Sequence, residues 1–247
     1  MATLLPEKIY NHLRRKLLAG EYHAGSRLDY KRISTEMGVS TTPVREAMGK
    51  LASEGLVDLI PRAGAIVRQL GEQEAVQLYG VREAIETYAA AKAAEKITDA
   101  RLKKLQSLLE RMGQLIKTNA AAGNRVMIGE DLAEFLESDL AFHMTIIDAA
   151  GNPRLSKLAV NSHTHSRIFG VERFGHDHEL LREADEIHWS IYRALQERDA
   201  AEASKLISRH INRSLELTLN HVNHERNDSW WKSDSTDSTG SKPLISA

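Results

Sequence analysis

The sequence predicts a mainly α-helical protein, in which a winged helix-turn-helix head precedes an antiparallel bundle of six helices. Two observations predict this fold class. Residues 5–70 hold three helical patterns and then two short apolar runs, whereas from Gly71 onward no convincing strand pattern occurs and apolar residues recur at helical spacing. We therefore expect a head over residues 1–70, a bundle over 71–223 and a flexible tail over 224–247.

The head is expected to open with two helices. The first is predicted over about Lys8–Ala19 because apolar residues recur every fourth position, at Ile9, Leu13 and Leu17. The second is short and has three members on one face, Tyr30, Ile33 and Met37. Gly38 follows at the position where a left-handed residue most easily ends a helix.

The segment Val39–Leu51 is the most informative part of the chain. A serine or threonine can cap the helix start, and Pro43 suits its first turn. The apolar residues fall on one side: Val44, Ala47, Met48 and Leu51. The other side is short and polar, with Thr42, Arg45 and Gly49. Such a face can lie in a DNA major groove, where arginine reads guanine, although an ordinary amphipathic surface helix has the same pattern.

Two strands are expected after this helix. Val57–Leu59 alternates, Pro61–Gly64 reads as a turn, and Ala65–Val67 returns as the second strand. Three helices followed by a hairpin form a winged helix-turn-helix, whose third helix enters the major groove. Arg62 in the turn can reach the adjacent minor groove.

The composition limits the class of protein. The 247 residues include 42% hydrophobic residues, enough for a buried core, and no apolar run reaches the length of a membrane span. No signal peptide is evident, so the expected location is the cytoplasm. Without cysteine, disulfides and thiol catalysis are excluded. Residues 1–70 hold 11 Lys and Arg against 7 Asp and Glu, so a mildly basic head precedes an acidic remainder.

The bundle helices are predicted from apolar spacing and from start and stop signals. Three helices precede Gly151, and Gly151-Asn152-Pro153 is a stop followed by a cap and a first-turn proline. A fourth helix is expected over about Pro153–Phe169 and a fifth over about Glu179–Glu197. Asp199, with Glu202 three residues later, resembles a capping box and opens the sixth. Trp230-Trp231 is the one apolar interruption of the expected tail.

Four residues of the bundle are polar where the pattern predicts apolar ones. Asp139 and His143 are four apart and project from one helical face, while His188 and His210 lie on the apolar stripes of two further helices. Because burying such groups is costly unless they are paired or bound to a metal, they form a candidate site for a divalent cation. Zinc fits, and nickel or manganese are alternatives. Hydrogen-bonded structural histidines or an internal salt bridge would also explain them.

Four further histidines precede His188 in the bundle part of the sequence. His165 falls on a core-like stripe and is a reserve ligand. The other three are expected to be solvated because they lie near a predicted loop: His163, His176 and His178.

The head resembles the DNA-binding domain of GntR-type bacterial transcription regulators. The resemblance covers residues 5–70 and rests on Thr-Pro-Val-Arg-Glu-Ala followed by Glu-Gly-Leu-Val. It implies DNA contacts from six positions: Lys31, Ser40, Thr41, Thr42, Arg45 and Gly64. With Arg62, expected above to reach the minor groove, the candidate DNA contacts number seven. Many relatives have arginine where this chain has Thr41, so the operator sequence is expected to differ.

The bundle resembles the all-helical FCD ligand-binding domain of FadR-like GntR regulators, over about residues 74–220. The resemblance implies that Asp139, His143, His188 and His210 bind a metal, and that the metal and an arginine of the first bundle helix hold a small carboxylic acid. Arg82 occupies that arginine's position and, alternatively, forms a surface ion pair with Glu86.

These features predict a metabolite-responsive transcription regulator, a repressor that binds a palindromic DNA operator as a homodimer. One alternative is a regulator for which the metal is itself the signal or is purely structural. Another is a metal-dependent hydrolase, because histidine-rich sites also hydrolyse esters and amides. The winged head argues against an enzyme, since a hydrolase has no use for it.

Overall fold

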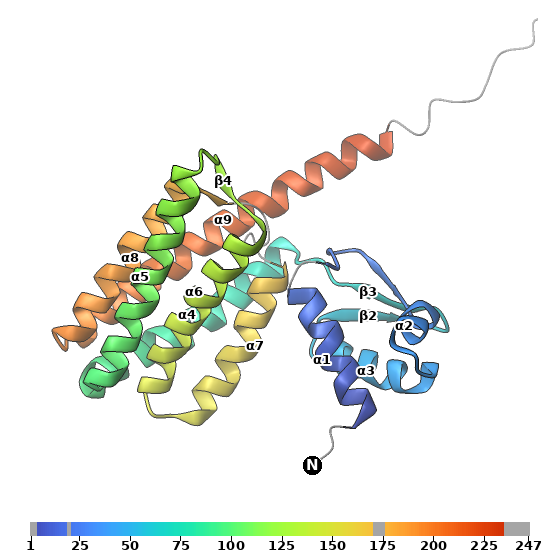
Figure 1. Cartoon of the computed structure of the whole chain (residues 1–247), viewed down its shortest axis with the longest axis horizontal. Helices are drawn as coiled ribbons and strands as arrows, with labels where there is room; N and C mark the ends of the chain where they lie inside the picture. The colour runs from blue at the N-terminus through green and yellow to red at the C-terminus, as the bar shows by residue number, and fades with distance from the viewer. Residues whose placement is uncertain (1–3, 19–20, 170–175, 235–247) are drawn as a thin grey trace, which may run out of the picture.

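The fold was analysed in a computed structural model, which describes residues 4–18, 21–169 and 176–234, with side chains as far as residue 220 and at Val222. The predicted mainly helical architecture is confirmed: a small head of helices and strands lies beside a larger group of helices (Figure 1). None of the described helices combines the length and apolar composition needed to cross a membrane.

The head contains three helices and a three-stranded antiparallel sheet among its described residues. The helices are α1 (Leu5–Leu18), α2 (Tyr30–Met37) and α3 (Thr41–Ser53). The strands are β1 (Arg27–Asp29), β2 (Val57–Ile60) and β3 (Gly64–Val67), in the order β1-β3-β2. The hairpin agrees with the prediction, and the Ala19 end predicted for the first helix lies outside the described residues.

Strand β1 was not predicted. Its three residues pair with β3, with Leu28 opposite Ala65 and Asp29 opposite Gly64. Only Leu28 is buried, and a single buried residue gives no periodicity from which a strand can be recognised.

Local signals in the sequence explain the start and end of α2. Asp29 accepts a hydrogen bond from the Arg32 amide at 2.8 Å, and Gly38 ends the helix with a φ of 65°. The start of α3 differs from the expectation. Ser40 occupies the N-cap position, but its side chain makes no capping hydrogen bond.

Gly64 is required by the close approach of β1. Its φ is 134°, and a Cβ atom there would lie 2.0 Å from the Leu28 carbonyl oxygen. Gly64→Ala is therefore expected to lower the free energy of unfolding by about 3 kcal/mol, measured by urea denaturation. Gly38→Ala is the matched control, because Gly38 also has positive φ but has nothing within 4 Å, so it should lose only about 1 kcal/mol. Equal losses in the two variants would contradict the close approach.

Within the residues that the structure describes, the bundle consists of six helices. They are α4 (Glu72–Lys96), α5 (Asp99–Ala121), α6 (Gly129–Ala149), α7 (Pro153–Phe169), α8 (His178–Gln196) and α9 (Ala200–Asp234). The predicted signals at their ends are present. Asn152 Oδ1 accepts a hydrogen bond from the Arg154 amide at 3.1 Å, and Asp199 Oδ1 accepts one from the Glu202 amide at 2.9 Å. The buried apolar faces of α4, α5, α6, α8 and α9 form one core cluster, and a smaller cluster joins α4 and α6 with α7.

Two features of this part differ from the expectation. Val126–Met127 (β4) and His176–Asp177 (β5) pair as a two-residue sheet, too short to leave a pattern in the sequence. Helix α9 continues to Asp234 and projects beyond the other bundle helices (Figure 1), so the first part of the expected tail is helical. No glycine or proline interrupts the chain there, and adding residues to an existing helix needs no new nucleus. Residues 235–247 and the side chains of Trp230-Trp231 lie outside what the structure describes.

Helix α7 packs against the head. Arg14 Nη2 on α1 donates to Thr164 Oγ1 on α7 at 2.6 Å, and Ile168 near the end of α7 joins the apolar core of the head. In Figure 1, α7 is the bundle helix that faces α1. The head and the bundle are therefore joined by buried contacts as well as by the chain.

Candidate nucleic-acid interface and candidate metal centre

Most of the residues expected to contact DNA are accessible. Lys31, Ser40, Thr42, Arg45 and Arg62 are exposed. Thr41 is half-buried. The opposite side of α3 is buried in the core of the head, so the polar side is the one presented to a partner.

Two residues at the start of α3 are available for contacts with DNA. The guanidinium of Arg45 lies over the ring of Tyr30, 5.4 Å from its centroid, a cation–π contact that restrains the side chain. Among the described residues Arg45 has no ion pair. The Ser40 hydroxyl, which does not cap the helix, is likewise free to act as a donor to a phosphate.

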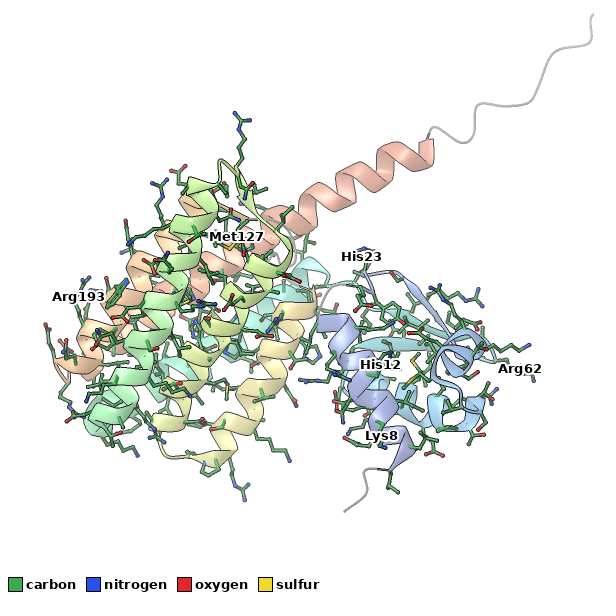
Figure 2. All side chains as sticks on the ribbon, in the orientation of Figure 1. Lys8, His12, His23, Arg62, Met127 and Arg193 are labelled. Carbon is green, nitrogen blue, oxygen red and sulfur yellow. The ribbon has the colours of Figure 1, made fainter. Side chains whose placement is uncertain are left out.

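The wing turn carries Arg62 at the outer end of the head, pointing away from the bundle (Figure 2). Arg62 is not a glycine but has a φ of 63°, a strained conformation that is enriched at functional sites. Gly64, by contrast, is buried against β1, and its glycine is explained by that packing. We therefore do not retain Gly64 as a DNA contact and retain the other six as proposed contacts.

The four residues of the expected metal site lie together in the bundle. Asp139 and His143 on α6, His188 on α8 and His210 on α9 each offer a ligand atom, and these atoms are all within 4.8 Å of one another. His188 Nε2 lies 3.3 Å from Asp139 Oδ1, and His143 Nε2 lies 4.0 Å from the same atom. The three histidines are buried and Asp139 is half-buried.

The unpartnered atoms of this cluster favour a bound cation. His143 Nε2 and both ring nitrogens of His188 are buried without a hydrogen-bond partner. Such orphaned polar atoms are rare and need an explanation. Three imidazoles and one carboxylate match the donor set of zinc, so the residues present fit a divalent metal.

The electrostatic environment keeps two imidazoles neutral, as metal binding requires. Burial lowers the pKa of His188 to about 4, and Asp139 only partly opposes the shift. Burial also holds the pKa of His210 well below its usual range, helped by the neighbouring His188. Their ring lone pairs are therefore available at neutral pH.

A second buried polar group, not predicted from the sequence, adjoins the first. Glu86 on α4 is 2% exposed, and its Oε2 lies 2.7 Å from His143 Nδ1. Its Oε1 accepts a hydrogen bond from Arg82 Nε at 3.0 Å and lies 3.1 Å from His163 Nε2. Burial disfavours the charged carboxylate, but the charges of His163, Arg82 and His143 together hold the pKa of Glu86 well below normal.

This group corrects three expectations. The Arg82–Glu86 ion pair is present but buried, each residue being 2% exposed, so it is not a surface pair. His163 is buried against Glu86 instead of being solvated. His165, the expected reserve ligand, belongs to neither of two histidine clusters, the four metal-ligand candidates and the group of Glu86, His143 and His163. Its Nδ1 contacts the Asn161 carbonyl oxygen at 2.8 Å.

The other two loop histidines are half-buried. His176 is in the short strand β5. His178 Nε2 lies 3.0 Å from Asn119 Oδ1. Both are outside the two histidine clusters.

A small cavity of about 70 Å³ lies beside the histidine cluster. This volume is well above the roughly 10–15 Å³ that a cavity needs to hold one water molecule. Its polar lining includes Arg82, Asp139 and His210. It shares lining residues, His210 and Ser214 among them, with a larger groove of about 570 Å³ between α8 and α9.

Comparison with known proteins bears on both parts of the chain. The family described as "Bacterial regulatory proteins, gntR family" matches residues 5–67, and the FCD domain matches residues 77–213. The transcriptional repressor RspR of Escherichia coli is 27% identical over 229 residues, covering 90% of this chain and 92% of RspR.

Two further relatives share part of the sequence or the fold. The gluconate operon transcriptional repressor of Bacillus subtilis is 34% identical over 142 residues, which cover 58% of this chain but only 54% of that protein. The solved structure of E. coli McbR superposes with a TM-score of 0.73 at 22% identity, over 89% of this chain and 99% of McbR. By their names, two of these relatives are repressors and McbR is an HTH-type transcriptional regulator, the class of protein that the winged head predicts.

Proposed function

Because the chain belongs to the GntR family of transcription regulators and carries an FCD domain, we propose that it is a repressor that senses a small carboxylic acid through a metal-bearing pocket. The observation that carries the proposal is the cluster of four metal-ligand candidates, two of which, Asp139 and His210, line one cavity together with Arg82. The relatives named above include two repressors.

The proposed DNA complex contains two copies of the chain. Each chain has one exposed polar α3 face, and a homodimer would present two such faces to a palindromic operator, whose half-site spacing mirrors the two-fold axis. Lys31, Ser40 and Thr41 are assigned to the phosphates. Thr42 and Arg45 are assigned to base edges in the major groove, and Arg62 to the minor groove.

In the proposed sensor, Asp139, His143, His188 and His210 hold the metal, with zinc the first choice and nickel or manganese the alternatives. The metal supplies a positive centre that can accept a carboxylate oxygen as a further ligand. Arg82 is positioned to bind the same acid through its guanidinium. The acid can change operator affinity only by the difference in its affinity for the two states of the protein.

A thermal-shift series tests this proposal. Acids that bind the native state should raise the melting temperature of the zinc-loaded protein, because saturation at 100-fold above Kd adds about 2.7 kcal/mol. The series includes gluconate, other sugar acids, hydroxy acids and dicarboxylates. Arg82→Lys should reduce the shift, whereas Arg111→Lys should not, because Arg111 forms an exposed pair with Glu134 away from the cavity.

One observation favours metal sensing as the second candidate. Arg82 already donates to Glu86 through Nε and to Ser166 through Nη1, so an acid would have to compete with these partners. If no acid shifts the melting temperature while zinc alone changes operator affinity, metal sensing replaces acid sensing.

A further inference from the structure

The buried group around Glu86 connects α6, which carries two of the metal-ligand candidates, with α7, which packs against the head. On one side, Glu86 Oε2 contacts His143 Nδ1 at 2.7 Å, which leaves the other ring nitrogen of His143 facing Asp139. A carboxylate at one ring nitrogen fixes the orientation of a metal-binding imidazole. On this side, Glu86 is therefore part of the sensing site.

On the other side, the same group is attached to α7. His163 Nε2 lies 3.1 Å from Glu86 Oε1, and Arg82 Nη1 donates to Ser166 Oγ at 3.2 Å. His163 and Ser166 both belong to α7, and all these side chains are buried. Two buried polar contacts therefore join α4 to α7.

Helix α7 also holds the DNA-binding head. Thr164, next to His163, accepts a hydrogen bond from Arg14 of α1 at 2.6 Å. Ile168, two residues after Ser166, is fully buried in the core of the head. An unbroken series of polar contacts thus runs from His143 through Glu86 to His163, and α7 continues it to α1.

We propose that Glu86 and His163 are positioning residues that couple the metal pocket to the DNA-binding head through α7. This inference rests on the proposed function, because it assumes that a cation binds at His143. Coupling of this kind is carried by packed side chains and hydrogen bonds that join two sites. It is also reciprocal, so operator DNA should change zinc affinity by the same factor by which zinc changes operator affinity.

Hydrogen–deuterium exchange of the full-length protein, with and without Zn²⁺, tests the coupling without knowledge of the effector. In the wild type, Zn²⁺ should slow exchange in α6, α8 and α9, which carry the ligands. It should also slow exchange in α7 and α1 by roughly fivefold or more, the lower end of usual coupling factors.

His163→Leu should separate these two effects. Glu86 keeps Arg82 and His143 as partners, so the variant should still bind Zn²⁺ and protect α6, α8 and α9. The protection of α7 and α1 should fall, because only the Arg82–Ser166 contact then joins the buried group to α7. His163→Gln should restore it, because the glutamine amide nitrogen can donate from nearly the position of Nε2. His178→Leu is the matched control, since His178 is half-buried and hydrogen-bonded but lies on α8; it should leave the protection unchanged.

A second variant acts at the other end of the series. Thr164→Val keeps the shape of the side chain and removes the acceptor for Arg14, so Zn²⁺ should still protect α7 fully but should protect α1 less, since Ile168 alone then holds α7 to the head core. Full protection of α7 and α1 in His163→Leu would overturn the coupling and leave the metal site intact. Absence of Zn²⁺ protection throughout the wild-type protein would instead overturn the metal site, and the coupling with it.

Discussion

Replacing Arg45 with alanine is expected to weaken operator binding by roughly 5- to 150-fold, the value of one well-placed arginine–base contact. Arg45 is exposed on the polar face of α3 and is held over the Tyr30 ring, so it can enter a groove with little loss of conformational freedom. The operator can be obtained by selection from random-sequence duplexes with the purified protein. Binding is then measured by fluorescence anisotropy at several salt concentrations.

Arg15→Ala is the control for this measurement. Arg15 is also exposed in the head, but it lies on α1 and its Nε contacts the Asn11 carbonyl oxygen. Arg15→Ala removes the same charge as Arg45→Ala. Any loss of DNA affinity should therefore be similar for the selected operator and for a random duplex, as expected when an arginine only attracts phosphates. Arg45→Ala should reduce the ratio of these two affinities. An unchanged ratio would show that Arg45 does not read bases.

The recognition helix could be predicted from sequence because its signals are local. Val44, Ala47, Met48 and Leu51 share one face by spacing alone, and all four are buried in the head. The left-handed stop at Gly38 is local in the same way. Strand β1 was missed because its pairing depends on Gly64, far along the chain, and not on a pattern of its own.

The four metal-ligand candidates were found because each interrupts an apolar stripe on its own helix, and the fold brings them within 4.8 Å of one another. The assignments on α7 were wrong for a related reason. His163 and His165 are two residues apart and so face different sides of a helix. The choice between them depends on which side of α7 meets α4 and which side meets the head.

Glu86 could not be identified from the sequence as a buried residue. Glutamate four residues after arginine is the usual pattern of an exposed helical pair. Only the tertiary structure shows that His143 and His163, from two other helices, surround its carboxylate. Ala89 and Ala90, which follow Glu86 on α4, are both fully buried, and small residues at these positions indicate that α4 packs closely against its neighbours there.

Removing two of the proposed ligands should abolish metal binding. If a four-ligand zinc site contributes about 10–16 kcal/mol, two ligands account for roughly half, so His188→Ala/His210→Ala should weaken zinc affinity by about 10⁴-fold or more. Metal content is measured by mass spectrometry after dialysis, and affinity by competition with a chelator. Zinc should raise the melting temperature of the wild type and leave that of the double variant unchanged.

The matched control is His165→Ala/His178→Ala, which also removes two histidines from the bundle. Neither belongs to the cluster, since His165 contacts the Asn161 carbonyl oxygen and His178 contacts Asn119, so zinc affinity should be retained. Folding of His188→Ala/His210→Ala without metal is checked by circular dichroism. His188 has no hydrogen bond to lose, only the 3.3 Å contact of its Nε2 with Asp139 Oδ1, so the variant loses mainly packing at that position. Undiminished zinc binding by a folded double variant would show that the ion is held elsewhere.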